Sequence, residues 1–362
     1  MALPPSQLQL ECAALSLPPI SWWRVVSERL RAGAQPGLLL GQLIAQRSRE
    51  RIEAASVLRS RALTAVRRAA DLGIACVAWS DIEYPSALAA ISDPPPVLWV
   101  RGVINSLSLP SVAIVGSRAG SAYACSVAER LAADLAARQV VVVSGLARGV
   151  DAAAHEGALS VGGTTIAVLG SGADVVYPRE HTKLADAIAR EGAVVSELEP
   201  GTPPRPMFFP QRNRIISGLA RAVVVVEAGD RSGSLITARF ALEQGRDVLA
   251  VPGNVLSGRN RGGHRLLRDG AKIVETADDI LEELDPGLLN PRPPAEASND
   301  EGAPRQAVDD PVLHVLTRGD PLDLDAIADR TGWSTARLLP RLFELELQGV
   351  VRRVGGGRFL RI

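Results

Sequence analysis

The fold is decided by residues 208–252, which read FFPQRNRIISGLARAVVVVEAGDRSGSLITARFALEQGRDVLAVP. In this stretch a basic loop leads into an apolar strand, VVVVEAG, and a helix start rich in glycine and serine follows, RSGSLITARF. Residues 201–226 contain four arginines and no acidic residue. Exposed backbone N–H groups at a helix start bind anions, and arginines beside them favour a phosphate. The stretch therefore predicts a phosphate site at the carboxyl end of a strand.

The same alternation of apolar runs and helical segments continues along the chain from Ile74 onward. Such continuous apolar runs are typical of strands buried on both faces, as in a parallel sheet covered by helices. We therefore predict an α/β fold with a mostly parallel sheet flanked by helices. The predicted strands are VLWV at 97, VAIVG at 112, VVVVS at 140, TIAVLG at 165, AVVSE at 193, AVVVVEA at 222, DVLAVPG at 247 and AKIV at 271.

Four segments are expected along the chain. Residues 1–75 show apolar residues at helical spacing and predict a small helical domain, of a SAM-like or helix-hairpin-helix-like type. Residues 76–285 hold the sheet. Residues 286–310 are rich in proline and acidic residues, which predicts a disordered linker. Residues 311–362 show three helical patterns and two β-like runs around a triple glycine, the outline of a winged helix.

The composition is that of a globular protein in a reducing compartment. The 362 residues suit two or three domains, and the three cysteines lie too far apart to indicate a disulfide framework or a zinc site. We therefore expect a cytoplasmic protein. The N-terminal residues lack the pattern of an export signal, and no window approaches the ~18 apolar residues of a membrane span. Only two of the forty basic residues are lysines, so the positions of the arginines are more informative than their number.

The first strand-to-helix junction is VAIVGSRAGSAYACSVAERLA, in which Gly116 and Ser117 end the strand. It resembles a dinucleotide-binding turn, but Arg118 stands where that turn needs a second glycine to let a pyrophosphate approach. The junction therefore favours a cation aimed into the crevice at the strand ends over a dinucleotide site. The alternative is a surface arginine on a tight turn.

The next two junctions add further cations. SGLARGVDAAAH places Arg148 in a loop and Asp151 at a helix start, four residues before His155. We assign the Asp151 and His155 pair to structure, because a capping carboxylate with a histidine one turn later needs no chemistry. In the following junction Arg179 and Lys183 flank a helix start. They either add charge to the crevice or form a solvated helix end.

The basic segment itself combines aromatic and cationic residues. Phe208 and Phe209 stand just before Arg212, Asn213 and Arg214, a combination that suits stacking on bases and pairing with phosphates. Packing of the phenylalanines in the core is the alternative. Ser232, Gly233 and Ser234 open the next helix with small residues that leave its N–H groups accessible to an anion, although plain helix capping gives the same pattern.

Several catalytic signatures are missing from the sequence. It contains no G-x-x-x-x-G-K-[ST] loop, no H-E-x-x-H and no G-x-S-x-G. We therefore expect no catalytic residue, no cofactor and no metal ion, and the protein is not predicted to be an enzyme.

Five blocks in order resemble the DprA/Smf family of DNA-processing proteins: VAIVGSR, SGLARGVDAAAH, FPQRNRIISGL, VVVVEAGDRSGSLITARFALEQGRDVLAVPG and GGHRLLRDGA. The resemblance covers about residues 84–284. It implies an extended Rossmann fold that binds single-stranded DNA in a basic pocket, forms a homodimer and helps to load RecA onto incoming strands during natural transformation. It implies no catalysis.

The resemblance also assigns residues to the DNA site. It puts Arg118 of the Gly116-Ser117-Arg118 turn in the DNA pocket and Arg212 and Arg214 of the FPQRNR block beside it. Ser232, Gly233 and Ser234 offer backbone N–H groups to a phosphate, and Arg179 follows the Tyr-Pro step of the family. The other residues of the predicted site are Arg148, Lys183, Phe209 and Asn213. Charge reversal of Arg118 or Arg212 is expected to abolish binding without loss of stability.

Two alternatives remain open at this stage. The winged helix carries Arg337 and Arg341 on its third helix, close to Glu344 and Glu346, so it suits duplex DNA and protein docking equally. The rival function is a nucleotide-processing enzyme of the lysine-decarboxylase-like kind, which releases a base from a nucleoside monophosphate. The PGGxGT-type loop of those enzymes is replaced here by PGNVLSG at residues 252–258.

Overall fold

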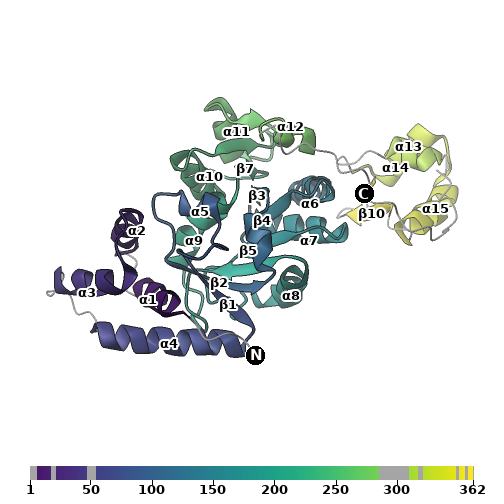
Figure 1. The fold of residues 1–362 in the computed structure, drawn as a ribbon. Helices are drawn as coiled ribbons and strands as arrows, with labels where there is room; N and C mark the ends of the chain where they lie inside the picture. The colour runs from purple at the N-terminus through teal and green to yellow at the C-terminus, as the bar shows by residue number, and fades with distance from the viewer. Residues whose placement is uncertain are drawn as a thin grey trace. The chain divides into compact units, whose positions relative to one another are not determined.

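The computed structural model describes residues 6–17, 22–46, 54–284, 310–316, 321–347, 350–354 and 358–361. The chain separates into two compact units, Met1–Pro291 and Arg292–Ile362, and each is described by itself (Figure 1). The predicted linker 286–310 lies outside the described residues except for Asp310. The domain boundaries at residues 75, 285 and 310 stay predictions.

The first unit is built on a nine-stranded sheet in the order β1-β2-β6-β5-β4-β3-β7-β8-β9. Its strands are β1 (Ile74–Ala78), β2 (Val97–Gly102), β3 (Ser111–Val115), β4 (Val141–Ser144), β5 (Thr165–Val168), β6 (Ala193–Ser196), β7 (Ala222–Val225), β8 (Asp247–Ala250) and β9 (Lys272–Ile273). All pairings are parallel except those of β2, which pairs antiparallel with β1 and β6. The eight predicted runs all form strands, so the mostly parallel sheet is confirmed.

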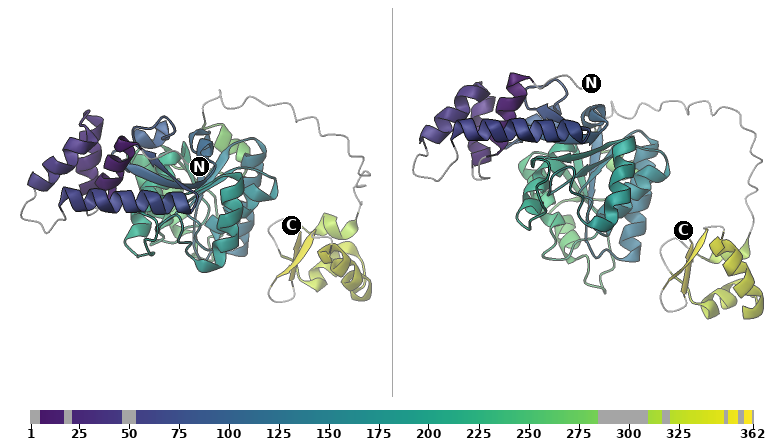
Figure 2. Two further views of the ribbon diagram at one scale, coloured as in Figure 1. Left: turned by 60° about the horizontal axis from the view of Figure 1, so that its bottom comes forward. Right: turned by 90° about the horizontal axis from the view of Figure 1, so that it is seen from below.

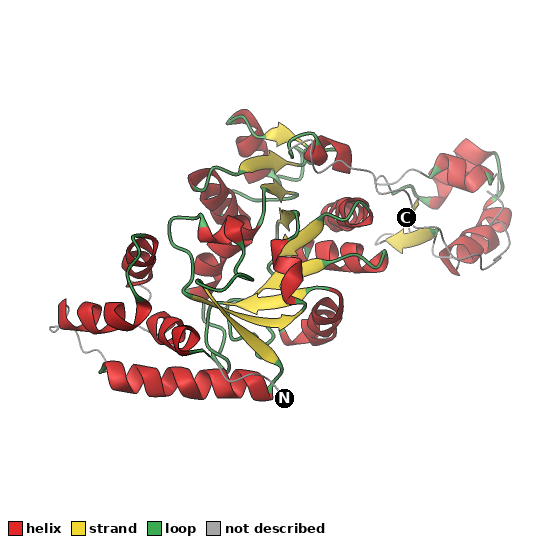
Figure 3. Cartoon of the chain, viewed as in Figure 1, coloured by secondary structure: helices red, strands yellow, loops and turns green. Residues whose placement is uncertain are grey.

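Helices cover both faces of this sheet (Figure 3). They are α5 (Ser86–Ala89), α6 (Ala122–Ala137), α7 (Val150–Ser160), α8 (Thr182–Glu191), α9 (Phe208–Leu219), α10 (Ser234–Glu243), α11 (Arg261–Arg268) and α12 (Ala277–Leu281), with short 3-10 turns η2 (Ile104–Ser108) and η3 (Arg179–His181). In β3, Val112 and Ile114 pack with α6 and α7, whereas Ala113 and Val115 pack with α9 and α10. Alternate residues of one strand therefore enter two different cores, which explains the continuous apolar run.

The N-terminal helices share their core with the antiparallel end of the sheet. They are α1 (Gln7–Ser16), α2 (Trp23–Arg31), α3 (Pro36–Gln46) and α4 (Ala55–Asp71). Trp22 and Leu39 are fully buried in one cluster with Trp99 of β2. The Gln9 side chain donates to the Cys76 carbonyl at 3.3 Å and to Asp81 at 2.9 Å, tying α1 to β1. Figure 2 shows these helices, in purple and dark blue, together on one side of the first unit.

In its described residues, the second unit has three helices followed by a two-stranded antiparallel ribbon. They are α13 (Pro311–Val315), α14 (Leu324–Thr331), α15 (Thr335–Leu347), β10 (Val351–Val354) and β11 (Arg358–Arg361). Val312, Ile327, Leu338 and Phe359 form its buried core. The order of elements confirms the predicted winged helix, although the triple glycine at 355–357 lies outside the described residues. In neither unit is a described helix both long and apolar enough to cross a membrane.

Candidate functional site

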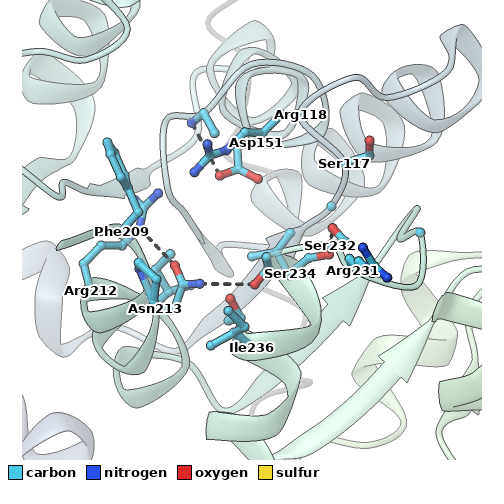
Figure 4. Close-up of a pocket in the computed structure, with 18 of the residues that line it drawn as sticks. Ser117, Arg118, Asp151, Phe209, Arg212, Asn213, Arg231, Ser232, Ser234 and Ile236 are labelled. Carbon is cyan, nitrogen blue, oxygen red and sulfur yellow. Dashed lines mark hydrogen bonds between the residues drawn. The ribbon is translucent and has the colours of Figure 1, made fainter. Parts of the chain in front are cut away.

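A concave site lies where the strand order of the sheet reverses. Strand β3 pairs with β4 on one side and β7 on the other, and the helices that follow β3 and β7, α6 and α10, pack on opposite faces of the sheet. Ligands of such sheets bind at this switch point, outside the carboxyl ends of the strands. A cavity of about 770 Å³ opens here. Figure 4 shows the side chains that surround it.

Nine of the thirteen predicted site residues line this cavity. They are Gly116, Ser117, Arg118, Phe209, Arg212, Asn213, Ser232, Gly233 and Ser234. They come from the turn after β3, from α9 and from the start of α10, so three segments far apart in sequence meet at one pocket.

The turn after β3 is shaped by close packing against the start of α7. A Cβ at Gly116 would lie 2.7 Å from the Val150 side chain, and a Cβ at Gly149 would lie 2.4 Å from the Ser117 carbonyl oxygen. Gly149 also has a φ of +73°, which favours glycine. This packing leaves the next residue, Arg118, exposed at the mouth of the pocket. Its guanidinium carbon lies 5.3 Å from the centre of the Phe209 ring.

The basic segment predicted as a loop is helix α9, and this part of the prediction was wrong. Pro210 lies in the first turn of the helix, where an N–H has no intrahelical partner and proline is tolerated. Ile215, Ile216 and Leu219 then pack against the sheet. The helix begins at Phe208, so its first turn presents Phe209 and Pro210 to the pocket.

Arg212 forms the floor of the pocket and is only 4 % exposed. Its Nη1 donates to the Gly145 carbonyl at 2.7 Å and to the Val168 carbonyl, and its Nε donates to Asn213 Oδ1 at 3.1 Å. Burial lowers the pKa of Arg212 to about 10, opposed by the nearby Asp151 carboxylate. The guanidinium is therefore charged at neutral pH and fixed by backbone carbonyls.

Asp151 is the acidic residue among those that line the pocket. Burial raises its pKa, and the Arg212 charge opposes that rise. The carboxylate accepts hydrogen bonds from the backbone N–H groups of Gly145 at 3.1 Å and Ala147 at 3.4 Å. Asp151 therefore orders the loop after β4. It does not cap α7, whose N-cap is Gly149 without a side-chain cap, so the predicted capping role was wrong.

Phe209 is half-buried and belongs to a small aromatic cluster. Its ring centre lies 5.5 Å from that of Tyr177, at an interplanar angle of 47°. A Cβ at Gly170 would come within 3.0 Å of the ring, so the end of β5 supports it closely. Tyr177 is 44 % exposed and also lines the pocket. Phe209 thus rests on the sheet and also contributes to the pocket wall, where Arg118 approaches it.

The start of α10 forms the third wall. Its N-cap is Gly233, and no side chain caps the helix. Ser232 and Ser234 hydrogen bond to each other through their hydroxyl groups at 2.8 Å, and Asn213 donates to the Gly233 carbonyl at 3.2 Å. An uncapped helix start beside arginines is suited to a phosphate.

Arg231 lines the pocket as well, and the sequence-based prediction missed it. It is exposed and directly precedes the Ser232 to Ser234 turn, so its place before the helix start was the available signal. Tyr177 also lines the pocket and was not among the predicted site residues.

Arg214 does not line this pocket. It is 3 % exposed, and its guanidinium binds the Glu197 carboxylate at 2.6 Å and Asp93 at 3.0 Å. Burial alone would lower the pKa of Arg214, but the two carboxylates raise it. These contacts fasten α9 to the end of β6 and to the segment before β2.

The remaining predicted cations also lie outside the lining set. Arg148 is exposed and forms an ion pair with Glu180, including a 2.9 Å contact from its Nη2. Arg179 in η3 and Lys183 on α8 are exposed to solvent. The structure therefore brings Arg118, Arg212 and Arg231 to the pocket and leaves these three on the surrounding surface.

His155 is a buried residue of α7 itself. It is fully buried, its Nδ1 lies 2.7 Å from the Thr165 hydroxyl, and burial lowers its pKa to about 3. Within the described residues, no group of three His, Cys, Asp or Glu side chains is arranged to hold a metal ion. The contacts of His155 match the structural role assigned to it from the sequence.

In the winged helix, Arg341 is engaged by acidic neighbours and Arg337 by an aromatic ring. Arg341 contacts Asp310 at 2.5 Å and Glu344 at 2.7 Å. Arg337 stacks on the Trp333 ring, 3.9 Å from its centre. The third helix thus has one cation neutralised by carboxylates, and the choice between duplex DNA and protein docking stays open.

Comparison with known proteins places this geometry in a family. The family model for DNA recombination-mediator protein A matches residues 75–285, and the model for the DprA winged helix domain matches residues 291–357. The chain belongs to the DprA/Smf family. The resemblance seen in the sequence is confirmed, and with it a Rossmann-like fold and membership among DNA-processing proteins of transformation and recombination.

Three relatives illustrate the match. Protein Smf of Escherichia coli is 43 % identical over 277 residues, covering 76 % of this chain and 74 % of that protein. The structure of DNA processing protein A from Streptococcus pneumoniae superposes with a TM-score of 0.66 at 37 % identity, covering 78 % of this chain and 99 % of that one. The Helicobacter pylori structure, which describes a single-stranded DNA binding mode, has a TM-score of 0.53 at 30 % identity and covers 58 % and 94 %.

Proposed function

We propose that this chain binds single-stranded DNA in the pocket at the β3 and β7 switch point. It does so without catalysing a reaction, protects incoming DNA in the cytoplasm and helps to load RecA during transformation or recombination. One observation carries the proposal: Arg118 lies over the Phe209 ring, beside the uncapped start of α10. The related protein from Helicobacter pylori is described as binding single-stranded DNA.

The pocket offers separate groups for the two parts of a nucleotide. Arg118, Arg231 and the N–H groups of Gly233 and Ser234 at the start of α10 suit a phosphate, while Phe209 and Tyr177 suit the face of a base. A duplex hides its base faces, so this arrangement favours a single strand. Arginine-phosphate contacts release counterions, which makes the affinity fall as the salt concentration rises.

A direct binding measurement tests this proposal. Fluorescence anisotropy with labelled oligo-dT and a duplex of the same length should show clearly tighter binding of the single strand. Equal affinity for the two DNAs would contradict the proposal.

The loading role is tested by adding RecA to oligo-dT coated with single-strand binding protein. RecA filaments are expected to form faster when this chain is present than when it is absent.

The homodimer is proposed to form at the β9 edge of the sheet. Strand β9 is short and is the last strand in the order of the sheet, and Ile273 on it is 57 % exposed. Leu242 of α10 is 62 % exposed and lines a groove together with Lys272 of β9. Open sheet edges with apolar side chains favour pairing with another chain. Ile273→Asp should lower the mass measured by sedimentation equilibrium from dimer to monomer; an unchanged mass would place the interface elsewhere.

The rival enzymatic function finds no support among the residues that line the pocket. Asp151 is their only carboxylate, and backbone N–H groups of the β4 loop engage it. A direct assay for base release from nucleoside monophosphates distinguishes the two functions. Release of the base is expected only if the protein is the enzyme.

A further inference from the structure

The loop between β8 and α11 presents two adjacent aliphatic side chains to solvent. Val255 is 76 % exposed and Leu256 is 93 % exposed; we call this pair the Val255–Leu256 tip. Single exposed aliphatic residues are ordinary on protein surfaces, whereas these two neighbours form a small continuous apolar surface at the end of one loop.

The loop holds the tip in a defined shape. The Asn254 side-chain oxygen accepts hydrogen bonds from the N–H groups of Leu256 at 2.8 Å and Ser257 at 3.3 Å. The Ser257 hydroxyl donates to the Asn254 carbonyl at 3.0 Å, and Gly258 takes a φ of +68° to close the turn. Side chain to backbone bonds of this kind order a turn locally. The exposure of the tip is therefore built into the loop.

The base of the loop touches the rim of the pocket. Arg259 Nη1 donates to the Ala119 carbonyl at 3.0 Å, and Ala119 follows Arg118 and lines the pocket. Asn260 is 2 % exposed and bridges the ends of β7 and β8, accepting from the Ala228 N–H at 2.9 Å and donating to the Val251 carbonyl at 3.0 Å. The tip therefore follows the strand adjacent to β7, on the edge of the sheet where the pocket opens.

The charges around the tip indicate what kind of partner it contacts. Residues 252–268 contain four arginines and no acidic residue. Three of them, Arg261, Arg265 and Arg268, are exposed at positions i, i+4 and i+7 of α11, on one face of the helix. Asp230, which precedes Arg231, and Asp269, which follows α11, are exposed acidic residues of the flanking segments. An apolar tip beside a row of cations complements a polyanion that also exposes apolar faces.

We propose that the Val255–Leu256 tip is a second base-binding element, which contacts the single strand as it leaves the pocket while the arginines of α11 follow its backbone. The proposal rests on the proposed function. Single-stranded DNA offers both phosphates and exposed base faces. A duplex hides its base faces, so it would not contact the apolar tip in this way. A purely apolar groove of a protein partner would have no group to pair with the arginines. Aliphatic side chains are known to wedge against bases.

The test compares oligo-dT of two lengths. The double variant Val255→Ser/Leu256→Ser keeps Asn254, Ser257 and the backbone bonds that shape the loop. Oligomers of about 6 nucleotides fill the pocket alone, and those of about 20 nucleotides also reach the tip. We expect the double variant to bind the short oligomer as the wild type does and the long one about threefold to tenfold more weakly. Val255→Phe/Leu256→Phe should bind the long oligomer more tightly.

Ile82→Ser is the matched control, since Ile82 is 96 % exposed on the turn after β1, at the opposite end of the sheet. This variant should bind the short and the long oligomer with the affinities of the wild type. An unchanged affinity of the serine variant for the long oligomer would overturn the proposal and leave the tip to a protein partner. An equal loss on both lengths would also overturn it. If the wild type did not bind the short oligomer, the proposed binding of single-stranded DNA in the pocket would itself be contradicted.

Discussion

At the scale of single residues, two arginines of the same pocket have different tasks because their burial differs. Arg118 is exposed and contacts the Phe209 ring, whereas Arg212 is 4 % exposed and bonded to carbonyls at the ends of β4 and β5. The sequence shows both simply as arginines near a predicted phosphate site. It could predict that they meet, but their burial depends on neighbours far away in the chain.

This difference changes the expected effect of charge reversal at Arg212. Arg212→Glu would place a carboxylate against the Gly145 and Val168 carbonyl oxygens, without water, so we expect a loss of about 3–5 kcal/mol in the free energy of unfolding. Arg118→Glu should leave that free energy nearly unchanged. Urea denaturation of both variants measures it, and equal stability of the two would show that the Arg212 contacts contribute little.

His155 provides a prediction about acid. Burial lowers its pKa from 6.5 to about 3, so between these pH values the unfolded chain binds a proton that the native protein does not. Stability should therefore fall as the pH falls from about 6.5 toward 3. His155→Asn should show a shallower fall in the urea midpoint over this range. Parallel curves for the two proteins would contradict the assignment.

At the scale of elements, the strands could be predicted because their apolar runs record burial on both faces, but α9 could not. Its arginines and Pro210 suggested a loop. On a helix, residues two apart point about 200° away from each other, so Arg212 and Arg214 cannot both face the pocket. A loop has no such fixed side-chain directions, so the loop prediction allowed both arginines to be assigned to the pocket. The partners of Arg214, Asp93 and Glu197, stand in other elements and carry no local signal.

The Arg214 cluster should stabilise the docking of α9. Arg214→Met leaves Glu197 buried without its cation, and we expect a loss of about 3–5 kcal/mol in unfolding free energy. Adding Glu197→Leu should recover much of that loss, because it removes the uncompensated charge. Both are measured by urea denaturation. If the double variant were no more stable than the single one, the ion pair would not be the cause.

At the scale of the whole molecule, the two compact units have separate hydrophobic cores. The pocket is made entirely of residues from the first unit. A chain ending at residue 291 should therefore fold and bind oligo-dT within about twofold of the full-length affinity. A large loss measured by anisotropy, with normal folding by circular dichroism, would assign part of the single-strand site to the winged helix.

In the proposed complex, Arg118 contacts the phosphate backbone of a single strand in this pocket. The most direct measurement is the affinity for oligo-dT at several salt concentrations, for wild type, Arg118→Glu and the control Arg130→Glu, whose side chain is 60 % exposed on α6. We predict that Arg118→Glu binds at least about tenfold more weakly and that its slope of log affinity against log salt is smaller by about 0.7. Equal affinity and slope for Arg118→Glu and Arg130→Glu would contradict the account.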